Sequence, residues 1–93
     1  MSVLELLGVN GTELRQKYHI RKIGIFGSES RNEASATSDV DILVEFERPV
    51  DFFEFIELKE HLERLLNRRV DLVTTKALKP QLRDRILREA VYV

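Results

Sequence analysis

A chain of 93 residues has room for one domain, because compact domains usually contain about 100 to 150 residues. Its composition, 43% hydrophobic and 33% charged, is typical of a folded domain with a charged surface and excludes a disordered chain. Fifteen basic and sixteen acidic side chains give a net charge of −1, so the chain lacks the positive excess of a general nucleic-acid-binding protein. It has no cysteine, which excludes disulfides, thiolate metal sites and thiol nucleophiles.

The sequence also lacks the signals of membrane proteins and of secreted proteins. No apolar run approaches the roughly 20 residues that a membrane-spanning helix needs. The N-terminal residues carry an early acid and no basic start, unlike a secretory signal. We therefore expect one cytoplasmic domain over residues 1–93, with no membrane contact and no direct binding of nucleic acid.

The first eighteen residues have the signals of two short helices. Ser2 followed by Glu5 fits a capping box at the start of the first helix, and Gly8 can close it. Asn10 or Thr12 can cap the second helix, which is predicted to run to about residue 18.

Three strands are predicted after these helices. Residues 20–26 form the first, with alternating apolar side chains, and a glycine follows directly. Residues 28–35 are small and polar, which predicts one or two helical turns and then a loop. Residues 40–46 form the second strand, in which Ile42, Val44 and Phe46 alternate with Asp41, Leu43 and Glu45, and residues 70–74 form the third.

Two further helices complete the predicted domain. Asp51 can cap the longer one, which runs to Asn67, and Glu54 completes a capping box. Pro80 suits the first position of the last helix, and residues 91–93 form either a short strand or a frayed end. This alternation predicts an α/β domain with helices packed on a sheet. The side chains expected to face inward are Phe52, Phe55, Ile56, Leu62, Leu65 and Leu66, and in the last helix Leu82, Ile86 and Ala90.

One set of residues carries the predicted chemistry: Gly27-Ser28, ten intervening residues, and then Asp39-Val40-Asp41. A glycine between a strand and a turn lets the backbone approach a ligand closely. The amides that follow it and the Ser28 hydroxyl can then bind phosphate. Asp39 and Asp41 lie two residues apart at the start of a strand, so their carboxylates project from one face and attract a cation. Oxygen ligands together with phosphate favour Mg²⁺ or Mn²⁺.

A third carboxylate, Asp71, lies between apolar residues in the third predicted strand. If the second and third strands are neighbours, Asp71 reaches the same site, and three carboxylates can hold two ions for in-line displacement at phosphorus. A purely structural alternative is that Asp39 caps a turn with Ser38 while Asp71 pairs with Arg69 or Arg31.

The spacing Gly27-Ser28-x₁₀-Asp39-x-Asp41, with Asp71 on a later strand, resembles the minimal nucleotidyltransferases of the DNA polymerase beta superfamily. The resemblance implies that family's α+β fold, a small mixed sheet in the order 1-2-3 whose first two strands are antiparallel. It implies that the three aspartates are catalytic and ligate Mg²⁺, with two ions expected and Mn²⁺ as the alternative. Asp71 would also take the proton of the acceptor hydroxyl, and Gly27 and Ser28 would bind the nucleotide.

The chain departs from the family pattern next to this motif. Many members read Gly-Ser-x-Ala-Arg-Gly, whereas this chain keeps Arg31 but has Ser30 and Asn32 in place of the alanine and the second glycine. We expect no loss of catalysis, because asparagine tolerates a left-handed backbone. Arg31 is assigned to nucleotide binding, where it either contacts phosphate or braces the loop.

Family members of this size resemble antitoxins whose partner is an all-helical HEPN ribonuclease encoded by a neighbouring gene. The resemblance implies transfer of AMP from ATP to a tyrosine of that toxin, with release of diphosphate, in a homo- or hetero-oligomer. Two alternatives to this activity stay open. The chain could instead be a non-catalytic antitoxin that neutralises its partner by binding, or an enzyme that transfers the nucleotide to a small molecule.

Overall fold

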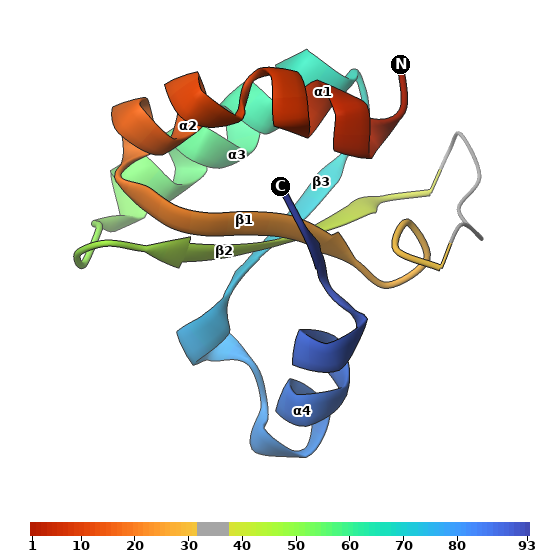
Figure 1. The fold of residues 1–93 in the computed structure, drawn as a ribbon. Helices are drawn as coiled ribbons and strands as arrows, with labels where there is room; N and C mark the ends of the chain where they lie inside the picture. Colours follow the sequence, from red (N-terminus) through yellow and green to blue (C-terminus); the bar gives the residue numbers. More distant parts are fainter. Residues whose placement is uncertain (32–37) are drawn as a thin grey trace.

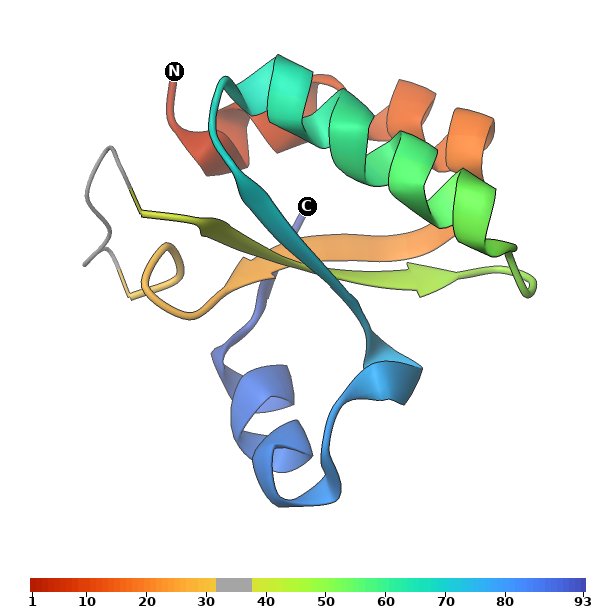
Figure 2. The same ribbon diagram turned by 180° about the vertical axis from the view of Figure 1, so that it is seen from behind.

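The computed structural model describes residues 1–31 and 38–93, and it places a sheet between helices (Figure 1). Helices α1, α2 and α3 cover one face of the sheet, and α4 lies on the other face (Figures 1 and 2). The predicted α/β class is confirmed. The elements are α1 (Val3–Val9), α2 (Gly11–Tyr18), β1 (Ile20–Phe26), β2 (Val40–Phe46), α3 (Phe52–Leu66), β3 (Val70–Thr74), the short 3₁₀ helix η1 (Thr75–Ala77), α4 (Pro80–Glu89) and β4 (Val91–Tyr92).

The sheet has the strand order β3-β2-β1-β4. The predicted order of the first three strands and the antiparallel pairing of β1 with β2 are confirmed, and β3 is parallel to β2. A three-strand sheet is nevertheless wrong, because β4 adds an antiparallel strand at the β1 edge. Gly24 makes this pairing possible, since a Cβ atom there would collide with the main-chain carbonyl of Val91.

The two N-terminal helices are joined with almost no loop. The capping box of Ser2 and Glu5 is present at the start of α1. Gly8 does not end this helix, which continues through Val9. The Asn10 side chain caps the end of α1 by donating to the Leu6 carbonyl at 2.8 Å, and it makes no side-chain hydrogen bond at the start of α2.

The core lies between the sheet and the three helices above it. In α3, the Asp51 carboxylate accepts a hydrogen bond from the Glu54 amide at 2.7 Å, as predicted. Phe52 is 71% exposed and lies outside the core, so the apolar stripe of α3 begins one turn later than expected. Fully or nearly fully buried side chains include Leu7, Leu14, Ile20, Ile23, Val40, Ile42, Val44, Leu58, Leu62, Val70 and Leu72.

Helix α4 packs far less tightly than α3. None of its residues is buried, and Leu82, predicted to face inward, is 43% exposed. Its partly buried side consists of Ile86, Leu87 and Glu89. No helix in the described part of the chain is long and apolar enough to cross a membrane.

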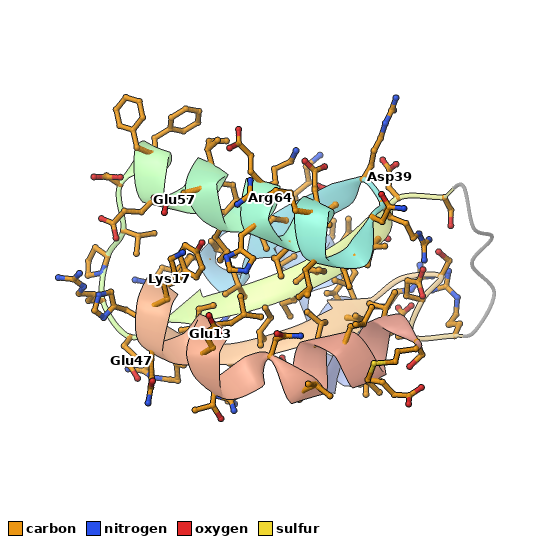
Figure 3. All side chains as sticks on the ribbon, turned by 90° about the horizontal axis from the view of Figure 1, so that it is seen from above. Glu13, Lys17, Asp39, Glu47, Glu57 and Arg64 are labelled. Carbon is orange, nitrogen blue, oxygen red and sulfur yellow. The ribbon has the colours of Figure 1, made fainter. Side chains whose placement is uncertain are left out.

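His61 joins α3 to α2 beneath the surface. Its Nδ1 atom lies 2.7 Å from the Tyr18 hydroxyl, at hydrogen-bonding distance. Partial burial is the main reason why the pKa of His61 is lowered. Charged side chains on the two helices also act on this pKa, with Lys17 and Arg64 lowering it and Glu13 and Glu57 raising it (Figure 3).

Candidate active site

The strand pairings bring the predicted site residues to one end of the sheet. The last residue of β1, Phe26, is paired with Asp41 on β2, and Asp41 is paired with Asp71 on the parallel strand β3. The residues before and after each aspartate are buried under the helices, so both carboxylates project from the opposite face. Asp39 lies just before β2 at the same end of the sheet, opposite the end that carries Glu47 (Figure 3).

Gly27 is in direct contact with the second aspartate. Its φ angle is 66°, in the left-handed region that favours glycine. A Cβ atom at this position would collide with the Oδ2 atom of Asp41. Both the backbone conformation and the available space therefore require a glycine here, and the turn passes directly beside the Asp41 carboxylate.

The electrostatic environment of Asp41 differs from that of an isolated carboxylate. Its pKa is raised, first because the group is partly buried, and then because Asp71 and Asp39 place negative charge beside it. A side-chain hydrogen bond with Asp71 raises the pKa further, whereas the positive charge of Arg31 lowers it. The three predicted carboxylates thus lie within electrostatic reach of one another, and the repulsion among them favours the binding of a cation.

These aspartates supply a donor set of carboxylate oxygens that suits a divalent cation such as Mg²⁺. Among residues 1–31 and 38–93, no three His, Cys, Asp or Glu side chains are arranged closely enough to hold a metal ion together. The negative charge that Asp71 and Asp39 place beside Asp41 is the observation that fits a cation, because a positive ion relieves this repulsion, which adds to the effect of burial on the pKa of Asp41. Asp39, Asp41 and Asp71 are the residues that would hold it.

Residues 27–31 form a turn closed by a hydrogen bond between residues four apart, which agrees with the shorter prediction of one helical turn. The rest of the predicted segment, from Asn32 on, lies outside the described residues. The Ser30 hydroxyl donates to the Gly27 carbonyl at 2.8 Å, and the Arg31 amide donates to the same oxygen at 3.3 Å. These two bonds close a tight turn, because both satisfy one carbonyl, and Ser28 lies half-buried within it.

Arg31 braces this turn against the end of α4. Its guanidinium forms an ion pair with Glu89, whose carboxylate also lies 3.4 Å from the Ser30 hydroxyl. Of the two predicted roles for Arg31, bracing is therefore present in the structure, and contact with phosphate stays a prediction. No local pattern points to Glu89, because it lies 58 residues from Arg31 in the chain.

Arg68 is a second residue that sequence reasoning missed. It follows α3, and its Nη2 atom donates to the Ser38 carbonyl at 2.7 Å and lies 3.2 Å from the Ser38 hydroxyl. Its Nη1 atom forms an ion pair with Glu29. Ser38 therefore bonds to Arg68. No spacing rule predicts such a contact across 30 residues of sequence.

Two hollows in the described part of the chain lie away from the site carboxylates. One, of about 450 Å³, is lined by residues around Glu45, Arg48 and Lys76 near the far ends of β2 and β3. The other, of about 380 Å³, lies beside His19 on the β1 side. Neither is lined by the predicted site residues. Asp39 and Asp71 are exposed, so a reacting group can approach them from the surface.

Comparison with known protein sequences gives the same interpretation. The profile of the nucleotidyltransferase domain matches residues 12–93. The chain is 50% identical over 88 residues to protein adenylyltransferase MntA of Thermococcus cleftensis, which covers 95% of this chain and 89% of the relative. It is 46% identical over 77 residues to a Methanocaldococcus jannaschii protein named as a candidate protein adenylyltransferase, covering 83% of each.

Solved structures share the fold. A minimal nucleotidyltransferase superposes with a TM-score of 0.81 at 36% identity, covering 98% of this chain and 95% of the other. A toxin–antitoxin structure with AMP-PNP gives a TM-score of 0.75 at 24% identity, covering 90% of this chain and 69% of the other. This second likeness is one of fold. The sequence and structural similarities together show that the chain belongs to the minimal nucleotidyltransferases of the nucleotidyltransferase domain family.

Proposed function

We propose that this protein is a Mg²⁺-dependent protein adenylyltransferase that transfers AMP from ATP to a tyrosine hydroxyl of a helical partner and releases diphosphate. The observation that supports this most is the pairing of Asp41 with Asp71 across β2 and β3, directly beside the Gly27 turn. The 50% identity to a protein adenylyltransferase supports the choice of AMP and of a protein acceptor.

Each residue of the site has a role in this reaction. The amides after Gly27 and the Ser28 hydroxyl bind the triphosphate, as donors at a tight turn do for phosphate. Asp39, Asp41 and Asp71 would hold divalent cations, which would supply positive charge to neutralise the triphosphate and to lower the pKa of the attacking hydroxyl. The acceptor oxygen forms a bond to the α-phosphorus, the bond from that phosphorus to the bridging oxygen breaks, and diphosphate leaves. The hydroxyl proton passes to Asp71.

The acceptor is proposed to come from another protein chain. Asp39 and Asp71 lie at the surface, and the hollows near Glu45 and near His19 are lined by other residues, which favours an acceptor that is presented from outside the chain. A tyrosine on a mobile segment can reach such a surface site. The fold is shared with an MNT antitoxin of Shewanella oneidensis in complex with a tri-AMPylated HEPN toxin, with a TM-score of 0.69 and 23% identity.

We propose a HEPN-type toxin from a neighbouring gene as the partner, in a hetero-oligomer located in the cytoplasm. AMP on a tyrosine adds a bulky anion, which would block an RNA-binding surface by charge and volume. An antitoxin that silences its partner by binding alone is the competing explanation.

Intact-mass spectrometry of the partner tests the proposal. The partner is incubated with this protein, ATP and Mg²⁺, and the expected result is a mass gain of one or more AMP units on tyrosine. Asp39→Asn should abolish the gain. Asp51→Asn is the matched control, because Asn caps a helix about as well as Asp and this residue lies at the start of α3.

Two other outcomes would contradict the proposed reaction. If the wild-type protein binds and silences the partner without any mass gain, and Asp39→Asn does the same, neutralisation occurs by binding alone. If ATP is consumed without a change in the partner, and a small molecule carries the AMP, the acceptor is wrong.

A further inference from the structure

We propose that Arg68 is a positioning residue that holds the two chain segments of the active site in register. These segments are residues 27–31, which follow β1, and residues 38–41, at the start of β2. The inference rests on the proposed function, because it assigns the triphosphate to the first segment and the cations to the second. Arg68 touches neither ligand in this assignment and acts through Glu29 and Ser38.

The contacts of Arg68 reach both segments from a third part of the chain. Its guanidinium forms the ion pair with Glu29 in the first segment and hydrogen bonds with the carbonyl and hydroxyl oxygens of Ser38 in the second. The neighbouring carbonyl of Arg69 accepts a hydrogen bond from the Val40 amide at 2.9 Å. We call these contacts of Arg68 with Glu29 and Ser38 the Arg68 clamp.

Each end of the Arg68 clamp lies one residue away from a proposed functional group. Glu29 directly follows Ser28, and Ser38 directly precedes Asp39. A displacement of Glu29 therefore moves the phosphate-binding turn, and a displacement of Ser38 moves the first metal-binding carboxylate. Because catalytic groups must be held within a fraction of an ångström, a fixed distance between these two segments matters for the reaction.

The Arg68 clamp is built more rigidly than an ordinary surface ion pair. The side chains of Arg68 and Glu29 are 18% and 13% exposed, whereas those of the Arg21–Glu45 pair are 56% and 33% exposed. Solvent weakens exposed pairs, while partly buried charge-assisted bonds are stronger and more directional. The planar guanidinium can also bond to two segments at once, which a lysine ammonium does with less geometric control.

The start of β3 positions Arg68 for this task. Asn67 ends α3 in a left-handed conformation with φ at 53°, so the chain turns sharply before Arg68. Val70 then enters the core of the sheet. Arg68 is thus fixed between a helix end and a buried strand, and the pairing of β3 with β2 holds its backbone beside residues 40–41. Residues 27–31 have no such strand pairing with β3, so the side chain of Arg68 is what links them to this frame.

Arg68→Met tests the inference, because methionine keeps much of the aliphatic stem and removes the guanidinium. Arg21→Met is the matched control, since it removes an arginine from another Arg–Glu pair far from the carboxylates. Amide hydrogen exchange of the peptides covering 27–31 and 38–41 is measured first. We expect exchange in both peptides to rise about tenfold in Arg68→Met, the effect of losing a charge-assisted bond, and to stay unchanged in Arg21→Met.

Steady-state kinetics then separates positioning from general destabilisation. In Arg68→Met the KM for ATP should rise about tenfold and kcat should fall, with the KM for the partner unchanged. Arg68→Lys should recover part of both losses, because it keeps the charge. Glu29→Gln keeps the size and shape of the side chain and removes its charge. It should reproduce the increase of amide exchange in residues 27–31, and it provides this test also if Arg68→Met fails to fold.

Exchange rates and ATP kinetics equal to those of Arg21→Met, in both Arg68→Met and Glu29→Gln, would overturn the inference. So would an equal rise of exchange in α3, because it would show a global loss of stability. The exchange measurement needs no activity. If the wild-type protein transfers no AMP while exchange rises only in residues 27–31 and 38–41 of the variants, the proposed function fails and the Arg68 clamp stands.

Discussion

Gly27→Ala should destabilise the protein for two separable reasons. The glycine has a φ angle of 66°, and an alanine Cβ in this conformation costs about 1–2 kcal/mol. The same Cβ would collide with the Asp41 carboxylate, which must then move away from its place beside the turn. Energies of interaction between contacting residues are about 0.5–3 kcal/mol. The expected total is therefore about 1.5–5 kcal/mol of lost unfolding free energy.

Urea unfolding of four proteins measures the two contributions: wild type, Gly27→Ala, Asp41→Ala and the double variant. Without the Asp41 carboxylate, Gly27→Ala should cost only the backbone part, so the cycle should show a coupling of about 1 kcal/mol or more. In thermal melts the single variant should unfold at least about 6 °C below the wild type, given about 4–8 °C for each kcal/mol in a domain of this size.

Gly8→Ala is the control for this experiment. A Cβ on Gly8 meets no atom within 4 Å, and the residue lies inside α1. Alanine should therefore stabilise the helix by about 0.5–1 kcal/mol. An equal cost of Gly27→Ala with and without the Asp41 carboxylate would refute the contact between the turn and this aspartate. A gain of stability like that of Gly8→Ala would refute the left-handed turn as well.

Three further predictions concern charge and catalysis. The pKa of Asp41 is raised in the folded protein. The stabilisation that this shift provides is therefore present below the ordinary pKa of aspartate, and it is lost as the pH rises through the pKa of Asp41 in the folded protein. Asp41→Asn should therefore have a higher melting temperature than the wild type at pH 7, and this difference should disappear in acid, while AMP transfer is lost. A difference in melting temperature that stays the same between pH 3 and 8 would contradict this. Asp71→Asn should lower kcat far more than it raises the KM for ATP, whereas Ser28→Ala should mainly weaken ATP binding, by about 1–2 kcal/mol. Equal effects of the two substitutions on kcat and on the KM for ATP would show that Asp71 and Ser28 do not have these separate roles. The pKa of His61, which lies at hydrogen-bonding distance from Tyr18, is lowered in the folded protein. The stabilisation that this shift provides is therefore present above the ordinary pKa of histidine, and it is lost as the pH falls through the pKa of His61 in the folded protein. Between pH 7 and pH 5 the melting temperature should therefore fall more steeply for the wild type than for His61→Gln. Equal slopes of melting temperature against pH would contradict this prediction.

Local patterns in the sequence determined most of the elements and the choice of candidate residues. The Ser2–Glu5 capping box, the Asp51 cap and the bounds of β2 were all predicted correctly, because each depends on residues within a few positions of one another. The spacing from Gly27 to Asp41 identified the family for a similar reason. The residues that define this motif lie in one turn and at the start of one strand, so they are close together in the sequence.

The tertiary structure alone decided how these elements meet. The β4 strand was left open because its pairing with β1 depends on the space at Gly24, on a strand 67 residues away from Val91 in the sequence. Leu82 fits the helical pattern yet is exposed, because α4 packs against the sheet along only part of its surface. Periodicity describes one helix and carries no information on how much of it a neighbour covers.

The same limit applies to the residues around the site. Glu89 and Arg68 reach the turn and the start of β2 from distant parts of the chain, so their charges pair only after the sheet and α4 are in place. The register that sets Asp41 beside Asp71 likewise arises from the burial of the residues on either side of them in β2 and β3. Local sequence thus specified which groups are available for the chemistry, and long-range packing decided which of them stand together, because contacts between distant segments depend on the whole core.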